Sequence, residues 1–408
     1  MQWESLGFKY NPFNTDPIKQ NTLSLYVGHE ESVHSCKDLL SGRNVTLVVE
    51  GARGVGTTSF SNALRFNAQE KKYYLTPQNE IRVERGWTLE TLLSVIIANV
   101  IREVELFHAE TITQDHRFQN AKALSSRISE VYRSLGLDAF GFGFNYGKSA
   151  GGSSQPMIVS SAVLGHHLED LTLLIQSIGY KHGILVQLNN LDIGAIHAED
   201  HMQYLFNALR DYVQTDGVSW IFVGDLGLRR FIAQSVDRLD DIVSFEVRIE
   251  PLSEKEYRHL LQKRIVYYTD NPRAKLPVSE EVLLYLYQIT KGRLRYTFGL
   301  LSRLVSGLHI GDLTDLITLN LAKPMVVKLA KERVSRHNLT PTEEEVLRWV
   351  VKLETASVGE LAQTLKKSPQ FISKILATLT AGRLITVKSH GRNRLCSPTL
   401  DAEIAYTE

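Results

Sequence analysis

Short apolar runs alternate with longer segments of helical periodicity in the first part of the chain. The runs typical of buried strands are Val45–Val49, Ile184–Leu188, Trp220–Val223 and Val243–Ile249, with a weaker one at Ile81–Glu84. Apolar residues recur at helical spacing in Leu89–Phe107, Ser160–Ile178 and His201–Val213. Strands that alternate with helices predict an α/β domain, in which a parallel sheet lies between two layers of helices.

The pattern becomes wholly helical after Pro251. Helices are predicted at Glu254–Tyr268, Ser279–Thr290 and Leu294–Leu308, and Ser335–Thr340 has the composition of a linker. We therefore expect three domains, with the α/β core over 1–250, an all-helical domain over 251–335 and a C-terminal domain over 336–408.

One segment, 138–156, breaks the alternation of the α/β core. Aromatic residues alternate with small residues in its first half, and glycines and serines follow. This pattern predicts an inserted hairpin with a flexible tip. It leaves open whether the hairpin packs on the core or binds DNA or a partner.

The C-terminal domain begins with two capping boxes, at Thr340–Glu343 and Ser357–Glu360, and each predicts the start of a helix. Ser368-Pro369 opens a third helix, and two short strands follow at Leu384–Lys388 and Asn393–Ser397. The apolar face of the third helix is formed by Ile372, Ile375, Leu376 and Leu379. Three short helices and a two-stranded ribbon predict a winged helix-turn-helix, similar to those of MarR-like regulators and origin-recognition proteins.

Positive charge is concentrated in one segment of this domain, although the 408-residue chain has a net charge of only +1. Seven lysines and arginines, and no acidic residue, lie between Lys366 and Arg394. In a helix-turn-helix the second helix enters the major groove while flanking cations hold phosphates. We therefore expect double-stranded DNA as a partner, with protein contacts as the alternative. The expected DNA-binding residues are Lys366, Lys367, Gln370, Ser373, Lys374, Lys388, His390, Arg392 and Arg394.

Composition excludes several other classes of protein. The chain is 43% hydrophobic and 22% charged, as in globular proteins. Its two cysteines, Cys36 and Cys396, lie far apart and form no metal-binding spacing, which suits a reducing compartment. The N-terminus has no signal-peptide pattern, and no apolar stretch is long enough to span a bilayer. We expect a cytoplasmic protein with no membrane partner and no structural metal.

The strand Val45–Val49 leads into a glycine-rich turn and then a helical pattern. The turn has the spacing G-x-x-x-x-G, which lets backbone N–H groups face phosphate oxygens at a helix N-terminus. The lysine that normally follows is Thr57, whereas Thr58 keeps the hydroxyl that would bind magnesium. Because a charge-assisted hydrogen bond contributes roughly 1.5–3 kcal/mol, the missing lysine should weaken nucleotide binding. Whether ATP or ADP binds is left open; the residues that would hold it are Gly51, Arg53, Gly54, Val55, Gly56, Thr57, Thr58 and Ser59.

The second half of a phosphate site also lacks charge. The strand Ile184–Leu188 ends at Asn189 and Asn190, where P-loop ATPases place the carboxylates that orient magnesium and polarise water. Amides carry no charge and cannot act as a base at neutral pH. Asp192 lies two residues further on, where we expect it to face elsewhere. The sequence therefore predicts weak or absent hydrolysis.

With these motifs in this order, the chain resembles AAA+ P-loop ATPases of the origin-recognition and STAND kind over residues 7–310. Gly7–Phe13 and Leu25–Glu31 resemble the segment that contacts adenine in that family, with His29 in place of an arginine. The resemblance implies nucleotide-sensing roles for Asp225 and Arg295, and an arginine finger at Arg229 or Arg230. A solvated or ion-paired arginine is the alternative in each case.

Three functions follow from these observations. The first is a DNA-binding AAA+-like scaffold or regulator that works in an oligomer or with a partner protein, in replication, transposition or defence. The second is an unconventional ATPase switch in which Arg53 and Asp192 or Asp225 replace the missing groups. The third is an adaptor that uses the winged helix for protein contacts.

Overall fold

The computed structural model describes residues 3–112, 114–134, 159–193, 199–307, 316–390 and 393–407. The predicted insertion at 138–156 lies outside the described residues. The chain forms two compact units, one of Asp16–Arg264 and one of Met1–Thr15 with Ile265–Glu408. The domain boundaries expected after residues 250 and 335 stay predictions.

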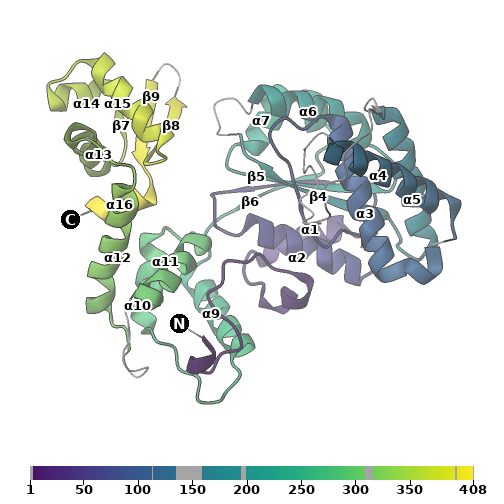
Figure 1. Cartoon of the computed structure of the whole chain (residues 1–408), viewed down its shortest axis with the longest axis horizontal. Helices are drawn as coiled ribbons and strands as arrows, with labels where there is room; N and C mark the ends of the chain where they lie inside the picture. Colours follow the sequence, from purple (N-terminus) through teal and green to yellow (C-terminus); the bar gives the residue numbers. More distant parts are fainter. Residues whose placement is uncertain are drawn as a thin grey trace. The chain divides into compact units, whose positions relative to one another are not determined.

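The larger unit is built on a parallel sheet, as the alternating pattern predicts (Figure 1). Its strands are β1 (Thr46–Gly51), β2 (Tyr74–Leu75), β3 (Ile81–Arg82), β4 (Gly183–Leu191), β5 (Val218–Gly224) and β6 (Phe245–Ile249). The strand order is β2-β4-β5-β1-β6, and β3 also pairs with β4. The carboxyl ends of β1, β4 and β5, which are neighbours, therefore share one edge of the sheet.

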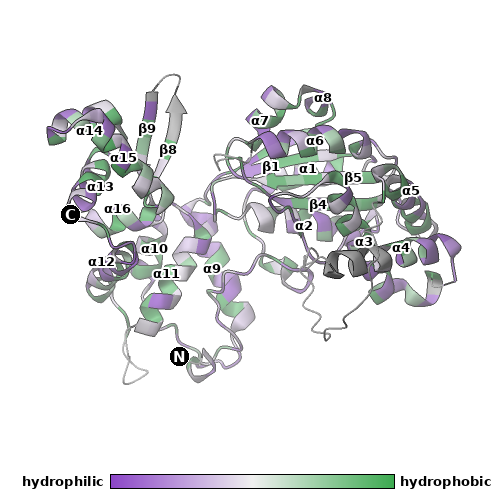
Figure 2. Cartoon of the chain, turned by 45° about the horizontal axis from the view of Figure 1, so that its top comes forward, coloured by the Kyte–Doolittle hydropathy of each residue, from purple (hydrophilic) through white to green (hydrophobic). Residues whose placement is uncertain are grey.

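Helices cover both faces of this sheet, and the central strands β1, β4 and β5 are buried and largely apolar (Figure 2). Leu185 and Val49 face α1 (Glu30–Leu39) and α2 (Thr57–Glu70) on one side. Val186 and Val48 belong to the core on the opposite side. That core is covered by α3 (Leu89–Ile112), α5 (Ser161–Ser177), α6 (Glu199–Val213) and α7 (Leu228–Ser235), with the short α8 (Asp237–Asp240).

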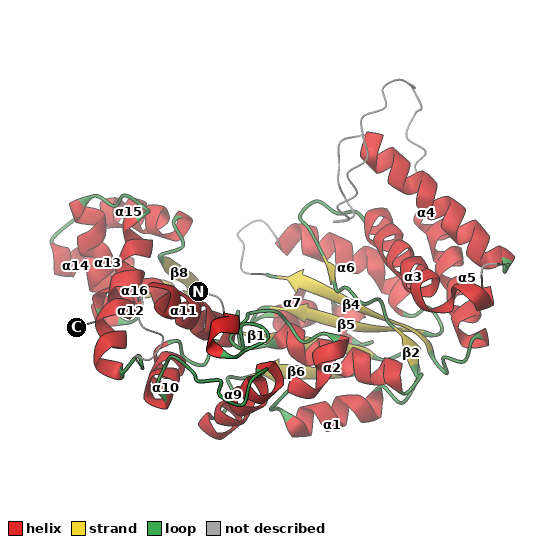
Figure 3. Ribbon diagram, turned by 60° about the horizontal axis from the view of Figure 1, so that its bottom comes forward, coloured by secondary structure: helices red, strands yellow, loops and turns green. Residues whose placement is uncertain are grey.

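The helix α4 (His116–Ser134) packs against α3 and α5, so that the three helices form a group beside the sheet (Figure 3). None of the helices in the described ranges combines the length and apolarity that a membrane crossing needs.

The smaller unit contains a helical part, as predicted. Its helices are α10 (Glu280–Ile289), α11 (Leu294–Gly307) and α12 (Leu319–Ser335). The boundary between the two units falls within α9 (Glu254–Tyr268), after Arg264. The N-terminal segment, with the 3-10 helix η1 (Trp3–Leu6), also belongs here. Phe13 packs against Trp3 and against Phe298 of α11, with ring centroids 5.7 and 6.0 Å away.

The C-terminal part of this unit is a winged helix, which confirms the sequence pattern. It consists of α13 (Pro341–Leu353), β7 (Ala356–Ser357), α14 (Val358–Leu365), α15 (Pro369–Ala381), β8 (Ile385–His390), β9 (Asn393–Pro398) and α16 (Leu400–Tyr406). Both predicted capping boxes are formed, at Thr340–Glu343 and Ser357–Glu360. The sheet is antiparallel, in the order β7-β9-β8. The sequence pattern did not reveal α16, which packs against α12.

Candidate functional site

The glycine-rich loop lies where the sequence predicts it, between β1 and α2. Gly54 and Gly56 adopt left-handed conformations, with φ of 90° and 118°, which favour glycine. A Cβ at Gly51 would lie 2.8 Å from both the Ile249 carbonyl oxygen and a Thr57 methyl carbon. Gly56, which has no side chain to cap α2, directly precedes its first turn. This geometry suits a loop that presents backbone N–H groups to an anion.

The glycine-rich loop carries one cation, Arg53, and its side chain is exposed. Its guanidinium pairs with the Asp192 carboxylate, with Nη2 and Oδ2 2.5 Å apart. Through this pair Asp192, which comes directly after β4, contacts the loop, contrary to the expectation that it faces elsewhere. The pair joins the two halves of the predicted phosphate site.

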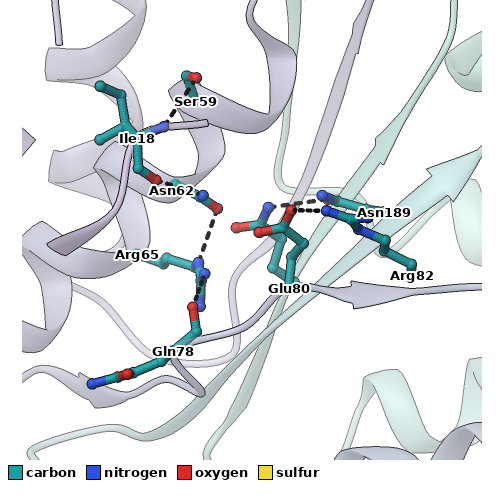
Figure 4. Close-up of polar contacts among 9 residues, drawn as sticks. Ile18, Ser59, Asn62, Arg65, Gln78, Glu80, Arg82 and Asn189 are labelled. Atoms are coloured by element: carbon teal, nitrogen blue, oxygen red, sulfur yellow. Dashed lines mark hydrogen bonds and ion pairs between the residues drawn. The ribbon is translucent and has the colours of Figure 1, made fainter. Parts of the chain in front are cut away.

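The two asparagines at the end of β4 have different environments. Asn189 is buried, on the same face of the sheet as Leu185, and its Oδ1 accepts a hydrogen bond of 3.0 Å from Gln187 Nε2. Asn190 is exposed and adopts a left-handed conformation, with φ of 65°. Figure 4 shows Asn189 beside Arg82 and Glu80, which form an ion pair. The Asn189 side chain is thus a buried, neutral amide that is already hydrogen-bonded to Gln187 of its own strand.

A polar network that sequence reasoning missed runs along α2 (Figure 4). Ser59 Oγ accepts a hydrogen bond from the Ile18 N–H at 3.3 Å, and Asn62 Nδ2 donates to the Ile18 carbonyl at 2.8 Å. Asn62 Oδ1 accepts from Arg65 Nε at 3.1 Å, and Arg65 Nη2 donates to the Gln78 carbonyl at 2.7 Å. The network fixes the chain around Ile18 to the helix that follows the loop.

Arg65 and Glu103 are the charged groups at the buried end of this network. Burial lowers the pKa of Arg65 to about 10. The negative charges of the nearby Glu80 and Glu103 act in the opposite direction and raise this pKa. Burial likewise raises the pKa of Glu103, although its carboxylate accepts hydrogen bonds from the Gln78 N–H and from Gln69. Arg65 therefore remains positively charged at neutral pH inside the protein.

Two carboxylates, those of Glu50 and Asp225, accept backbone hydrogen bonds near the ends of β1 and β5. Asp225, the predicted sensing residue after β5, accepts a hydrogen bond of 3.0 Å from the Ile193 N–H, next to Asp192. Glu50, at the end of β1, accepts from the N–H groups of Gly227 and Arg229 at 3.0 and 3.1 Å. The latter contact places a carboxylate at the start of α7, where the helix dipole favours negative charge.

The three predicted functional arginines lie in different surroundings. The guanidinium of Arg229 pairs with Asp240 and Glu246 of its own unit. Arg230 is exposed, and its Nε donates to Gln234 Oε1 at 3.2 Å along α7. Arg295 is exposed in the first turn of α11, in the smaller unit. Of the two candidate arginine fingers, Arg229 is already ion-paired within the chain.

The predicted DNA-binding residues lie on the surface of the winged helix wherever their side chains are described. Lys366 ends α14 in a left-handed conformation, with φ of 51°, and Lys367 follows it. The exposed residues are Lys366, Lys367, Gln370, Ser373, Lys374 and Arg394. Lys388 and His390 belong to β8, and Arg392 lies outside the described residues. Sequence reasoning missed Phe371, which is also exposed on α15.

Comparisons with known proteins agree with this architecture. No protein-family model matches the chain. The chain is 22% identical over 402 residues to an uncharacterised HTH-type transcriptional regulator of Methanocaldococcus jannaschii, covering 95% of this chain and 90% of that protein. Its structure is similar to that of the Aeropyrum pernix ORC2 protein in ADPNP–ADP complexes, with a TM-score of 0.51, 13% identity, and coverage of 97% and 96%. The Aeropyrum pernix ORC1 protein in complex with DNA gives a TM-score of 0.49, 14% identity, and coverage of 93% and 92%.

The chain therefore has the fold of the Aeropyrum pernix ORC2 protein, with a parallel sheet between layers of helices and a C-terminal winged helix. It is a distant homologue of the Methanocaldococcus jannaschii HTH-type regulator.

Proposed function

We propose that the protein is a DNA-binding scaffold or regulator, in which the winged helix binds duplex DNA and the nucleotide site does not hydrolyse. It works in an oligomer or with a partner protein, and Arg230 is the exposed arginine of α7 that faces such a neighbour. The observation that carries the proposal is the run of basic residues without acidic ones, exposed at the end of α14 and on α15.

The charge of this surface supports DNA as the partner. Lys366 and Lys367 lie immediately before α15, and Lys374 lies on its exposed face. Cations at these positions release counterions when they bind phosphates, which makes the affinity depend steeply on salt. The name of the distant relative, an HTH-type transcriptional regulator, supports the same role.

The chemistry of the nucleotide site supports a scaffold rather than an ATPase. Thr57 stands at the lysine position, and Asn189 and Asn190 stand where carboxylates would orient magnesium and activate water. If ATP or ADP binds, the loop from Gly51 to Ser59 would hold its phosphates, and Thr58 would provide the hydroxyl for magnesium. Without a general base on β4, a bound nucleotide would stay intact.

The DNA proposal is tested by measuring duplex affinity by fluorescence anisotropy at about 50 and 200 mM salt. We expect the wild-type affinity to fall steeply between these salt concentrations. Lys366→Glu with Lys367→Glu should reduce the slope of log affinity against log salt by about two. The matched control is Lys71→Glu with Lys72→Glu, another exposed pair that follows a helix and includes a left-handed residue. Wild-type protein that binds no duplex in a salt-dependent way would contradict the proposal and favour a protein-contact role.

One observation favours a second function, an unconventional nucleotide switch. The Arg53–Asp192 ion pair supplies both a cation and a carboxylate at the two halves of the site. In such a switch the Arg53 guanidinium would break its ion pair with Asp192 and then contact the phosphates. Asp192 would therefore compete with the nucleotide for the guanidinium.

Nucleotide binding and phosphate release test this second function. We expect Asp192→Asn to tighten binding of a fluorescent ADP analogue, because it frees Arg53. Asp216→Asn is the control, since Asp216 also pairs with an exposed arginine, Arg43, at 2.5 Å. A switch further requires phosphate release that Thr58→Ala abolishes. Equal affinity in the wild type and Asp192→Asn, together with no phosphate release, would rule the switch out.

A further inference from the structure

Helix α15 presents one large apolar side chain to solvent within a polar surface. Its buried face is complete, since Ile372, Ile375, Leu376 and Leu379 are at most 6% exposed. Phe371 lies outside that face and is 43% exposed. The other exposed residues of the helix between Gln370 and Thr378 are polar or small, namely Gln370, Ser373, Lys374, Ala377 and Thr378. Phe371 is therefore a large apolar side chain that remains partly exposed on the otherwise polar outer surface of α15.

We propose that Phe371 reads the 5-methyl group of a thymine in the major groove. This inference rests on the proposed function, because it requires that α15 contact duplex DNA. The N-terminal residues of a recognition helix contact base edges, and Phe371 is the third residue of α15, which begins at Pro369. The thymine methyl is the apolar group that the major groove offers, and phenylalanine is one of the side chains that contact it.

The backbone around Phe371 is fixed by the helix cap. Ser368 Oγ accepts a hydrogen bond of 3.3 Å from the Phe371 N–H, and Pro369 occupies the first helical position. Because the start of the helix is held in this way, the ring has a defined place in the first turn. Such an anchor favours contact with one base rather than with several.

The residues next to Phe371 indicate a base pair rather than a protein surface. Gln370 precedes it, and Lys374 lies one turn further along the same side of the helix. Glutamine can bind adenine through two hydrogen bonds, so Gln370 and Phe371 together fit neighbouring A·T pairs. The centre of a protein interface is depleted of lysine, whereas this ring lies in a segment with seven basic and no acidic residues.

The test removes the methyl group from the DNA and the ring from the protein. Duplexes that bind the full-length chain are selected from a random pool, and each thymine of the selected sequence is replaced by uracil in turn. At one or two positions we expect uracil to weaken wild-type binding about fourfold, as burial of one methyl group implies. Phe371→Ala should bind the thymine duplex about fourfold more weakly and no longer distinguish thymine from uracil. Phe371→Leu should keep part of the discrimination.

Leu353→Ala is the matched control, since Leu353 is 40% exposed in the same winged helix but lies outside the basic segment. It should distinguish thymine from uracil as the wild type does. If no thymine position is sensitive, or if Phe371→Ala still discriminates, the inference is overturned while salt-dependent DNA binding stands. If the chain selects no duplex at all, both the inference and the proposed function fail.

Discussion

Arg65 shows how a single charged residue can be kept inside this protein. Its side chain is 1% exposed, and its guanidinium donates to Asn62 and to the carbonyls of Pro77 and Gln78. Charges are rarely buried unless they are paired and hydrogen-bonded, and Glu80 and Glu103 provide the opposite charge nearby. The residue therefore organises the chain between α2 and β3 rather than the nucleotide loop itself.

We expect Arg65→Leu to destabilise the larger unit by about 3 kcal/mol, because it leaves the Pro77 and Gln78 carbonyls without their donor and removes the positive charge near the buried Glu103. Urea unfolding monitored by circular dichroism measures the change. The control is Arg43→Leu, which removes an arginine from its ion pair with the exposed Asp216 and should change stability by about 1 kcal/mol or less. Equal effects of the two substitutions would show that the buried network does not stabilise the unit.

At the scale of elements, the sequence predicted what is encoded locally. The strands β1, β4 and β5 were predicted because apolar runs mark strands buried on both faces. Strand β6 was predicted as well, although only its Val247 and Ile249 are buried. Strand β2 has two residues, Tyr74 and Leu75, which is too short for any periodicity. Helix α16 was missed for a similar reason, since it has only seven residues and follows directly after β9.

The residues of the candidate site likewise fall into those that the sequence predicted and those that it did not. The loop glycines and the asparagines at the end of β4 could be identified from their neighbours in sequence. The partners of Arg53 and Arg65 could not, because tertiary folding brings them together. Arg53 and Asp192 are 139 residues apart in the chain, and nothing in either segment specifies the other.

At the scale of the whole molecule, the winged helix is joined to the helical part of its unit through α16. Asp401 of α16 pairs with Arg333 of α12 at 2.7 Å and accepts a hydrogen bond from Tyr296 of α11. Burial, with Asp401 beside the hydroxyl, raises the pKa of Tyr296, so the phenol stays protonated. Three helices from two predicted domains thus meet at one carboxylate.

The joint is the contact of α16 with α11 and α12. We expect Asp401→Ala to weaken this joint, because the half-buried Arg333 would lose its partner. The free energy of unfolding should fall by about 1–3 kcal/mol. Limited proteolysis should then cut faster within residues 336–340, between α12 and α13. Glu403→Ala in the same helix removes only a pair with the exposed Lys291 and should leave the cleavage rate unchanged. An unchanged rate for Asp401→Ala would show that other contacts hold the joint.

The acid-free segment of the winged helix also has a consequence for the rest of the chain. Since residues 366–394 contain seven basic and no acidic residues while the whole chain has a net charge of +1, the remainder has six more acidic than basic residues. On the proposed function, such an electric asymmetry orients the molecule during diffusional encounter, because DNA attracts one part and repels the other. The productive collisions are then those in which the recognition helix faces the DNA. Added salt should slow association, because it screens the charges that produce this orientation.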